Sequence, residues 1–136
     1  MTRIRRVSVT FPFQLLEDFD DIIDKIGYGS RSKAVHDAVR LFISDKKWLQ
    51  EESGEYAGVL MMLYEHDVRG LEGVLTHIQH HFAHVIYSTM HVHLSEKDCL
   101  EAIAVKGNVA EIRKLSDELS AERGVKILKT MLVPSL

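Results

Sequence analysis

The sequence contains very little cysteine: among its 136 residues only Cys99 carries a thiol, so no disulfide can form within the chain. A single reduced cysteine is typical of a cytosolic protein. The sequence also lacks any run approaching the ~20 apolar residues that a membrane-spanning helix needs. Its first residues do not lead into an apolar signal core. We therefore expect a cytoplasmic protein with no membrane partner.

The chain also has little net charge, a formal −3, which argues weakly against binding of nucleic acid. This charge is divided unequally. Residues 1–48 contain nine Lys/Arg and seven Asp/Glu, a net of +2, whereas residues 49–136 contain eight and thirteen, a net of −5. The first ten residues include three arginines and no acid. Such a local basic arm matters more than the total charge when the partner is a phosphate backbone.

The first part of the chain has the pattern of one short strand followed by two helices. Residues 5–10 alternate polar and apolar, as a half-exposed strand does. Apolar residues then recur at helical spacing after Pro12, and Gly27 is a suitable stop. Ser30 is a good N-cap for a second helix that runs to about Trp48. The apolar residues that recur at helical spacing in the first helix are Leu15, Leu16, Phe19, Ile22, Ile23 and Ile26. Those of the second helix that are expected to face inward are Ala34, Val35, Ala38, Val39 and Phe42.

A polar segment at residues 49–55 has no apolar period and marks the expected domain boundary, which gives domains of 1–50 and 56–136. The second domain shows strand and helix patterns in the order βαββαβ. That order is the split βαβ, or ferredoxin-like, pattern, so the expected fold class is α+β. The expected elements are strands at 57–64, 86–94, 99–105 and 125–133 and helices at 71–84 and 110–123.

The lone strand of the first domain indicates a way to contact DNA. One strand cannot form a sheet alone, but the strands of two copies can pair as an antiparallel ribbon, which fits the major groove of double-stranded DNA. Arg6, Ser8 and Thr10 would project from one face of that ribbon because strand side chains alternate. Arginine can read guanine through two hydrogen bonds, and the hydroxyl groups can meet several base edges. The alternative is an ordinary edge strand with its polar residues outward.

Histidine is concentrated in one part of the second domain, where seven of the eight lie between His66 and His93. His91 and His93 point to the same side of their strand. A turn at residues 95–98 brings Cys99 back toward them. Two imidazoles and a thiolate from one hairpin suit borderline or soft divalent metals rather than Mg²⁺ or Ca²⁺. The alternative is that the two histidines are simply exposed strand residues.

A fourth ligand would have to come from another element. His77, His80, His81 and His84 are spaced i, i+3, i+4 and i+7, which places them along one stripe of the predicted helix. The alternative for any one of them is a solvated helix face. The spacing alone therefore leaves the fourth ligand open.

The first domain resembles the ribbon–helix–helix repressors. The likeness rests on Arg6-Val-Ser-Val-Thr10, on Gly27-Tyr28 and on Ser30-Arg31-Ser32. It implies that Arg6, Ser8 and Thr10 read bases. It also implies that the start of the second helix, near Ser30 and Arg31, holds a phosphate through its free N–H groups.

The whole chain resembles the nickel-responsive repressors of the NikR family, through Gln79-His80-His81, His91-Val92-His93-Leu94, Asp98-Cys99-Leu100-Glu101 and Val105-Lys106-Gly107. The resemblance implies square-planar Ni(II), one ion per subunit, held by His91, His93 and Cys99 of one chain and His80 of a neighbouring chain. It also implies an ACT-type second domain, a homotetramer made of two strand-paired dimers, and operator binding promoted by the metal. Three further residues are expected to orient the ligands through hydrogen bonds: Glu101, Gln79 and Tyr64. A buried tyrosine and ordinary surface polar residues are the alternative.

The sequence departs from the family pattern in two places. The family often has four histidines in a row after the glutamine, and here Phe82 and Ala83 interrupt the run, so extra metal sites there are in doubt. Lys33 stands where the family commonly has an acid, which pairs with the one at Asp37 to bind a cation. A charged lysine cannot ligate a cation, and its ammonium group is expected to pair with Asp37 instead.

Two functions of other classes remain open. The ACT-like domain could bind an amino acid or another small molecule, with the histidines incidental. The chain could also be a metal-using enzyme, which needs an open coordination position and a positioned acid or base. Glu101 is the only nearby candidate for that acid or base, and no substrate pocket is readable from the sequence. We therefore expect no catalytic residues and no enzymatic activity.

Overall fold

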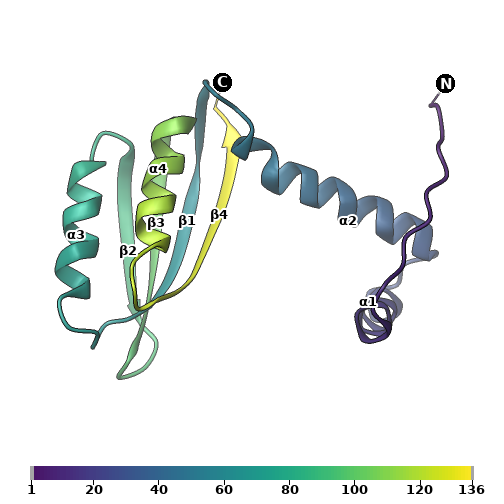
Figure 1. The fold of residues 1–136 in the computed structure, drawn as a ribbon, viewed down its shortest axis with the longest axis horizontal. Coiled ribbons are helices and arrows are strands. Elements are labelled where there is room, and N and C mark those ends of the chain that lie inside the picture. Colours follow the sequence, from purple (N-terminus) through teal and green to yellow (C-terminus); the bar gives the residue numbers. More distant parts are fainter. Residues whose placement is uncertain (1, 136) are drawn as a thin grey trace. The chain divides into compact units, whose positions relative to one another are not determined.

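The computed structural model describes residues 2–135. The chain forms two compact units, the first ending at Phe42 and the second beginning at Ile43 (Figure 1). Both residues belong to helix α2 (Arg31–Lys46). The domain limits expected from the sequence, 1–50 and 56–136, stay a prediction. Among the residues described, no helix is both long enough and apolar enough to cross a membrane.

The first unit contains α1 (Phe13–Lys25) and most of α2, with ends that follow the local sequence. Gly27, just after α1, has φ +82°, a left-handed conformation that glycine adopts readily after a helix. The Ser30 hydroxyl accepts a hydrogen bond from the backbone N–H of Lys33 at 3.1 Å. This bond satisfies one of the free N–H groups at the start of α2 and confirms Ser30 as its N-cap.

The strand predicted at residues 5–10 is absent from the single chain, where residues 2–12 have no regular secondary structure. A strand exists only when its N–H and C=O groups pair with another strand. The remainder of the first unit is helical and offers no such partner. Pairing with the strand of a second chain stays a prediction.

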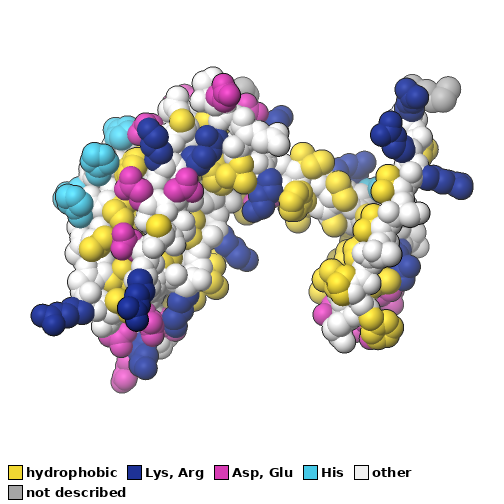
Figure 2. Space-filling view, viewed as in Figure 1, with side chains coloured by type: hydrophobic (Ala, Val, Ile, Leu, Met, Phe, Trp, Pro, Cys, Tyr) yellow, Lys and Arg dark blue, Asp and Glu magenta, His cyan; other side chains and the backbone are white. Residues whose placement is uncertain are grey.

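The apolar faces of α1 and α2 are largely exposed, although the sequence predicts that the apolar face of α2 points inward. Within the two helices only Ile23 and Ala34 are buried. Exposed apolar side chains gather over α1 and α2 (Figure 2). A hollow of about 370 Å³ lies among them, lined by Phe11, Leu15, Leu16, Phe19, Arg31, Val35, Ala38, Val39 and Phe42. Contiguous exposed apolar surface of this kind marks an interaction site.

The second unit is a four-stranded antiparallel sheet with two helices, in the predicted order βαββαβ. Its strands lie in the spatial order β2-β3-β1-β4, and every neighbouring pair is antiparallel. The fold class is therefore α+β, with the split βαβ connectivity. A short 3₁₀ helix, η1 (Lys47–Leu49), precedes the elements of this unit: β1 (Glu55–Glu65), α3 (Leu71–His81), β2 (Ile86–His93), β3 (Asp98–Asn108), α4 (Val109–Ser120) and β4 (Val125–Pro134).

Helices α3 and α4 cover one face of this sheet, and the core lies between them and the strands (Figure 1). Alternate residues of β3 are buried on that face, as the two-residue period of a strand requires. From α4, the inward positions predicted at Ile112, Leu115 and Leu119 are confirmed as fully buried. Each such side chain stabilises the fold by roughly 1.5–3 kcal/mol.

Helix α3 ends at His81, so the predicted extension to His84 is wrong. Phe82 and Val85 are both buried in the core. Their burial turns the chain inward directly after α3, and the Val85 N–H bonds to the Phe82 carbonyl in a tight turn at 3.0 Å. Hydrophobic burial here outweighs continuation of the helix.

No helix in the described part of the second unit covers the opposite face of the sheet (Figure 1). This face carries many apolar side chains. The strand register puts them on a common face. They include Val59, Met61, Met90, Val92, Ile127, Met131 and Val133, all of which are exposed.

The segment that enters the second unit is held by Arg113 of α4. Its guanidinium group donates hydrogen bonds to the Trp48 carbonyl at 2.7 Å and to the Glu51 carbonyl at 2.5 Å. The Trp48 side chain is itself buried in the core of this unit. The first residues of the segment predicted to be a linker are therefore fixed to α4.

Candidate metal centre

Three adjacent strands align the candidate ligands at one end of the sheet. In the register of the sheet, Cys99 of β3 lies directly between His93 of β2 and Tyr64 of β1. Glu101 of β3 lies opposite His91 of β2. Directly opposed residues of antiparallel strands point to the same side. All five side chains therefore project from the face that the helices cover.

A tight turn connects β2 and β3, the hairpin that carries three of the candidate ligands. The Ser95 hydroxyl accepts hydrogen bonds from the N–H groups of Lys97 at 3.2 Å and Asp98 at 3.0 Å. The Leu94 N–H donates to the Asp98 carbonyl at 2.9 Å. This turn fixes the strand register and so sets His93 beside Cys99.

Cys99 is fully buried, and its sulfur lies 3.2 Å from Nδ1 of His93. Burial, together with the negative charge of Glu72, raises the pKa of the Cys99 thiol above its ordinary value. The thiol is therefore neutral at physiological pH in this state. Since only the thiolate is a metal ligand, metal binding must release its proton.

His91 contacts Tyr64, whose hydroxyl lies 3.4 Å from Nε2 of the imidazole. Burial, and secondarily the charge of Glu101, raises the pKa of the Tyr64 hydroxyl above its ordinary value. Tyr64 therefore keeps its proton, and its O–H can donate a hydrogen bond to Nε2 of His91. The role predicted for Tyr64, to orient a metal ligand through a hydrogen bond, stays a prediction.

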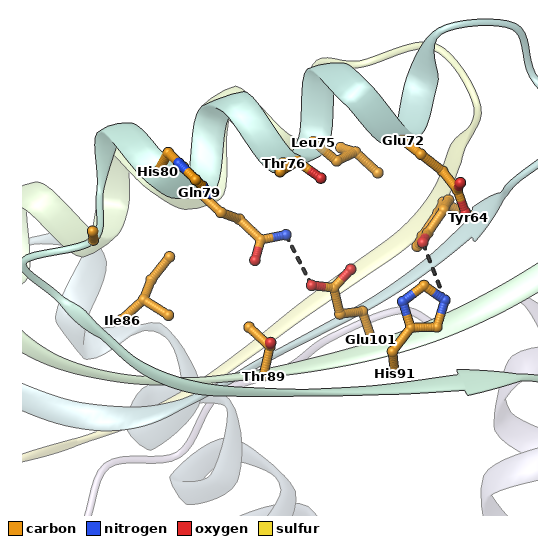
Figure 3. Close-up of a pocket in the computed structure, with 11 residues that line it drawn as sticks. Tyr64, Glu72, Leu75, Thr76, Gln79, His80, Ile86, Thr89, His91 and Glu101 are labelled. Atoms are coloured by element: carbon orange, nitrogen blue, oxygen red, sulfur yellow. Dashed lines mark hydrogen bonds between the residues drawn. The ribbon is translucent and has the colours of Figure 1, made fainter.

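Gln79 and Glu101 connect helix α3 to the sheet. The Gln79 amide donates a hydrogen bond to the Glu101 carboxylate at 2.9 Å (Figure 3). Glu101 is only 8 % exposed, and a buried carboxylate without a hydrogen-bond partner would destabilise the fold. This hydrogen bond anchors α3 over the row of β3 that contains the candidate ligands.

His80 lies on α3 next to Gln79 and is exposed. It lines a pocket of about 500 Å³, together with Tyr64, His91 and Glu101 (Figure 3). Figure 3 shows its side chain near the far end of α3 from His91. The structure thus places His80 in the same pocket as one predicted ligand, but not beside it.

The donor atoms around Cys99 fall into two overlapping groups. His66, His93 and Cys99 form one, and Glu72, His91 and Cys99 form the other. Within each group one donor atom from every residue lies within 4.8 Å of the others. His91 and His93 are in different groups, and His80 is in neither. A single chain thus brings together three of the four predicted ligands around one sulfur, and the fourth stands apart.

Two of these residues, His66 and Glu72, were missed by the sequence reasoning. His66 follows β1, and its N–H donates to the Lys97 carbonyl at 2.8 Å. Glu72 lies in the first turn of α3. His66 comes two residues after Tyr64, a spacing that keeps it on the same side of the chain. This spacing points to Cys99 only if one knows that β1 pairs with β3.

The remaining histidines of the region lie away from Cys99. His77 and His81 are exposed on α3, and His84 follows the end of that helix. His84 Nε2 lies 3.4 Å from a carboxylate oxygen of Glu111 on α4. Histidines gather on the surface around α3 (Figure 2). The predicted four-residue stripe is therefore broken at its end.

The residues predicted to contact DNA belong to the first unit. Arg6, Ser8 and Thr10 are exposed in the segment without secondary structure. The Arg31 guanidinium forms two bonds to the Asp20 carboxylate, Nε to Oδ1 at 3.0 Å and Nη2 to Oδ2 at 2.6 Å. This pair joins α2 to α1, so the Arg31 side chain is engaged within the unit.

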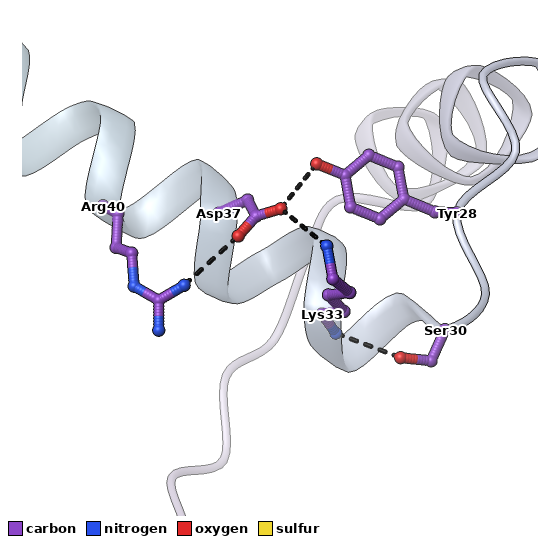
Figure 4. A network of polar contacts seen from close by, with 5 residues as sticks. All are labelled: Tyr28, Ser30, Lys33, Asp37 and Arg40. Carbon is purple, nitrogen blue, oxygen red and sulfur yellow. Dashed lines mark hydrogen bonds and ion pairs between the residues drawn. The ribbon is translucent and has the colours of Figure 1, made fainter.

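The expected pairing of Lys33 with Asp37 is present at 3.4 Å. The Tyr28 hydroxyl donates to the same carboxylate at 2.7 Å, and Arg40 lies 3.3 Å from its other oxygen (Figure 4). The Tyr28 hydrogen bond, aided by Lys33, lowers the pKa of Asp37. Two cationic side chains and a hydroxyl therefore surround Asp37. Replacement of the family's cation by Lys33 stays a prediction.

Comparison with known proteins identifies the family of the chain. Residues 57–133 match the family described as the NikR C-terminal nickel binding domain. A nickel-responsive regulator from Dictyoglomus turgidum is 49 % identical over 127 residues, which cover 93 % of each chain. One from Methanocaldococcus jannaschii is 42 % identical over 135 residues, or 98 % of this chain and 96 % of the relative. This chain therefore belongs to the family of nickel-responsive regulators.

Proposed function

We propose that this protein is a transcriptional repressor that binds Ni(II), one ion per subunit, and thereby gains affinity for double-stranded operator DNA. The observation that carries the proposal is the cluster around Cys99, where a buried thiol lies 3.2 Å from His93 and shares a donor group with His91. A thiolate with several imidazoles suits borderline transition metals such as nickel. The donor set of the chain therefore fits the metal that its family implies.

The proposed ligands are His91, His93 and Cys99 of one chain and His80 of a neighbouring chain. The exposure of His80, and its absence from both donor groups around Cys99, support donation to another subunit. Tyr64 would hold the His91 ring through its hydroxyl. Gln79 and Glu101 would connect the helix that bears His80 to the strand that bears Cys99.

Metal binding between subunits gives a physical basis for regulation. A bridging ion favours one arrangement of the subunits, and DNA affinity rises only to the extent that this arrangement is the one that fits the operator. The exposed apolar face of the sheet supports assembly through the second units. We propose a homotetramer, a dimer of strand-paired dimers.

For the DNA-binding element we propose a two-stranded ribbon formed by residues 5–10 of two chains. Val7 and Val9 are 75 % and 65 % exposed in the single chain, although they alternate with the polar residues of the segment. In a paired ribbon they would cover the apolar hollow of α1 and α2, while Arg6, Ser8 and Thr10 would face the bases. Pairing of two chains would thus bury the exposed apolar surface of the first unit and also give residues 5–10 a strand partner.

Phosphate contact is proposed at the start of α2. Free backbone N–H groups and the helix dipole attract an anion at a helix N-terminus. The Arg31 side chain is already paired with Asp20. We therefore assign this contact to the backbone at Ser30 and Arg31 rather than to the Arg31 guanidinium.

Titration of the full chain with Ni²⁺, followed by absorption spectroscopy, tests the metal centre. Cys99 is the only cysteine, so any sulfur-to-nickel charge-transfer band reports on this residue alone. We expect one ion per subunit and loss of the band in Cys99→Ser, while His77→Ala serves as a matched exposed histidine control. An unchanged nickel spectrum in Cys99→Ser would mean that the proposed site is wrong.

Operator binding is tested with double-stranded DNA selected from a random-sequence pool in the presence of nickel. Arg6→Ala should weaken binding to the selected DNA by ~1–3 kcal/mol for each bidentate contact that it removes. Nickel affinity should stay the same because Arg6 lies outside the metal unit. Equal DNA affinity with and without nickel would contradict regulation by the metal.

A further inference from the structure

Glu72 lies beside two of the proposed nickel ligands, although the proposed ligand set does not include it. It stands in the first turn of α3, and a carboxylate oxygen, a ring nitrogen of His91 and the Cys99 sulfur lie within 4.8 Å of one another. Its side chain extends from α3 toward Tyr64 and His91, with which it lines the same pocket (Figure 3). Oxygen, nitrogen and sulfur donors of one chain thus surround a common position.

An acidic residue in the first turn of a helix has an ordinary explanation, because its charge stabilises the helix dipole. Glu111, in the first turn of α4, is such a residue, and its carboxylate pairs with Lys114 and lies near His84. Glu72 differs, because its carboxylate forms no ion pair with a basic side chain within residues 2–135. The helix dipole does not explain why its side chain points to His91 and Cys99.

The charges of Glu72 and Cys99 favour a cation between them. Burial, and after it the negative charge of Glu72, raises the pKa of the Cys99 thiol. A metal binds the thiolate, and a thiolate and a carboxylate within 4.8 Å repel each other. A divalent ion bound to both groups removes this repulsion. One Ni²⁺, one thiolate and one carboxylate together carry no net charge, which lowers the cost of burying the ion.

We propose that Glu72 donates a carboxylate oxygen to the nickel ion as a fifth ligand, from the same chain as His91 and Cys99. This inference rests on the proposed function, because His91 and Cys99 are ligands in that site. Ligand atoms lie about 2.0–2.3 Å from ions of this kind, so two ligands of one ion are at most about 4.6 Å apart. Glu72 is exposed, and a small rotation of its side chain is enough to bring the oxygen within that limit.

A fifth ligand changes the electronic state of bound nickel. Four ligands in a plane pair all the d electrons of Ni²⁺, and the ion is diamagnetic. An oxygen donor outside that plane leaves two electrons unpaired, and the ion is paramagnetic. Carboxylate oxygens also suit ions that have no preference for a planar arrangement. Glu72 thereby determines the geometry of the bound ion and weakens any selection between metals that depends on a planar site.

Two variants separate ligation by Glu72 from its charge at a helix end. Glu72→Gln has nearly the same shape as the unaltered side chain, but it lacks the charge and leaves an amide, which is a poor ligand. Glu111→Gln is the matched control, because it also removes an acid from the first turn of a helix. Thermal unfolding of the metal-free proteins should show similar midpoints for the two variants.

The test measures the magnetic susceptibility of the full chain loaded with one Ni²⁺ per subunit. The unaltered chain and Glu111→Gln should be paramagnetic, and Glu72→Gln should be diamagnetic. Competition with a chelator should show nickel binding weakened at least about tenfold in Glu72→Gln, but loss of a neighbouring charge alone can have that effect. The magnetic state therefore decides between a ligand and a neighbour.

Two results would overturn the inference. One is diamagnetic nickel in the unaltered chain. The other is the same magnetic state in Glu72→Gln as in the unaltered chain, even if binding is weaker, because Glu72 would then act through its charge alone. Neither result would overturn the nickel site itself, which the sulfur-to-nickel band and its loss in Cys99→Ser test separately.

Discussion

Mixing of two defective subunits provides a decisive test of whether the metal is shared between chains. His80 lies on α3 and Cys99 on β3, and the donor groups around Cys99 do not include His80. The shared-site proposal therefore requires that His80 come from another subunit. In His80→Ala and in Cys99→Ala, each homotetramer lacks one ligand at every site.

The expected recovery can be calculated from the composition of the sites. After complete exchange of the two variants at equal amounts, half of the hairpins carry Cys99 and half of the helices carry His80. If each site takes its hairpin and its helix from different chains, about one quarter of the sites regain all four ligands. If both come from the same chain, no site regains them.

The assay is the sulfur-to-nickel absorption of the exchanged mixture, compared with the mean of the two parent proteins. The Cys99→Ala parent has no thiol and contributes no such band. Any band of the His80→Ala parent is subtracted through that mean. For a shared site, the expected excess over the mean is about one quarter of the difference in absorption between the unaltered protein and the His80→Ala parent.

The mixed tetramers also need an independent control of exchange. Subunits labelled with different masses would show by native mass spectrometry that heterotetramers have formed. If exchange is complete and absorption does not exceed the mean of the parents, the metal is not shared as proposed. The regulation built on an intersubunit ion would then fail with it.

Three further predictions concern stability. Arg113→Ala should lower the free energy of unfolding of the second unit by about 1.5–3 kcal/mol, because it removes charged donors from the Trp48 and Glu51 carbonyls. Urea denaturation followed by Trp48 fluorescence measures this loss. Arg123→Ala, at an exposed arginine, is the control and should change the free energy of unfolding little. Gln79→Leu should lower the free energy of unfolding by about 1–3 kcal/mol, because it removes the amide that donates to the Glu101 carboxylate. In a double-mutant cycle with Glu101→Leu, the loss in the double variant should be smaller than the sum of the two single losses. Simple additivity would refute the coupling. The Arg31 hydrogen bond lowers the pKa of Asp20. This pair therefore stabilises the first unit at pH values above the ordinary Asp pKa of about 4, and its contribution is lost as the pH falls below that value. The melting temperature of the unaltered chain should fall with decreasing pH more steeply than that of Asp20→Asn, and parallel curves for the two proteins would contradict the prediction.

The elements of the second unit could be predicted because their signals are local. Alternation within β2 and β3 and the turn at Ser95 lie within a few residues of one another, so the approach of Cys99 to His93 follows from the sequence. The helix positions of Ile112, Leu115 and Leu119 follow equally from a 3.6-residue period. These predictions need no information from distant parts of the chain.

The position of His66 could not be predicted in the same way. It depends on the pairing of Tyr64 with Cys99, residues that are far apart in sequence and that no local pattern connects. The end of α3 was also missed, because the burial of Phe82 and Val85 depends on a core formed by other elements. The position of His66 and the end of α3 are therefore both determined by tertiary contacts that no local sequence pattern shows.

The structure of the first unit in a single chain could not be predicted for a different reason. Its sequence has the patterns of a strand and of apolar helix faces, which need a partner that a single chain does not supply. Residues 5–10 alternate as a strand should, and the helices have apolar faces, yet the segment has no strand and those faces are exposed. Isolated strand pairs and small exposed helices gain little stability on their own. The pattern is physically consistent only if a second chain completes the strand and covers the helices.

A metal shared between subunits makes the response a matter of coupling rather than of affinity alone. An ion that binds equally well whatever the arrangement of the subunits cannot shift that arrangement, however tightly it binds. Nickel held by His91, His93 and Cys99 of one chain and by His80 of another would prefer the arrangement that completes its site. Because coupling is reciprocal, operator DNA must then tighten nickel binding by the same factor by which nickel tightens DNA binding.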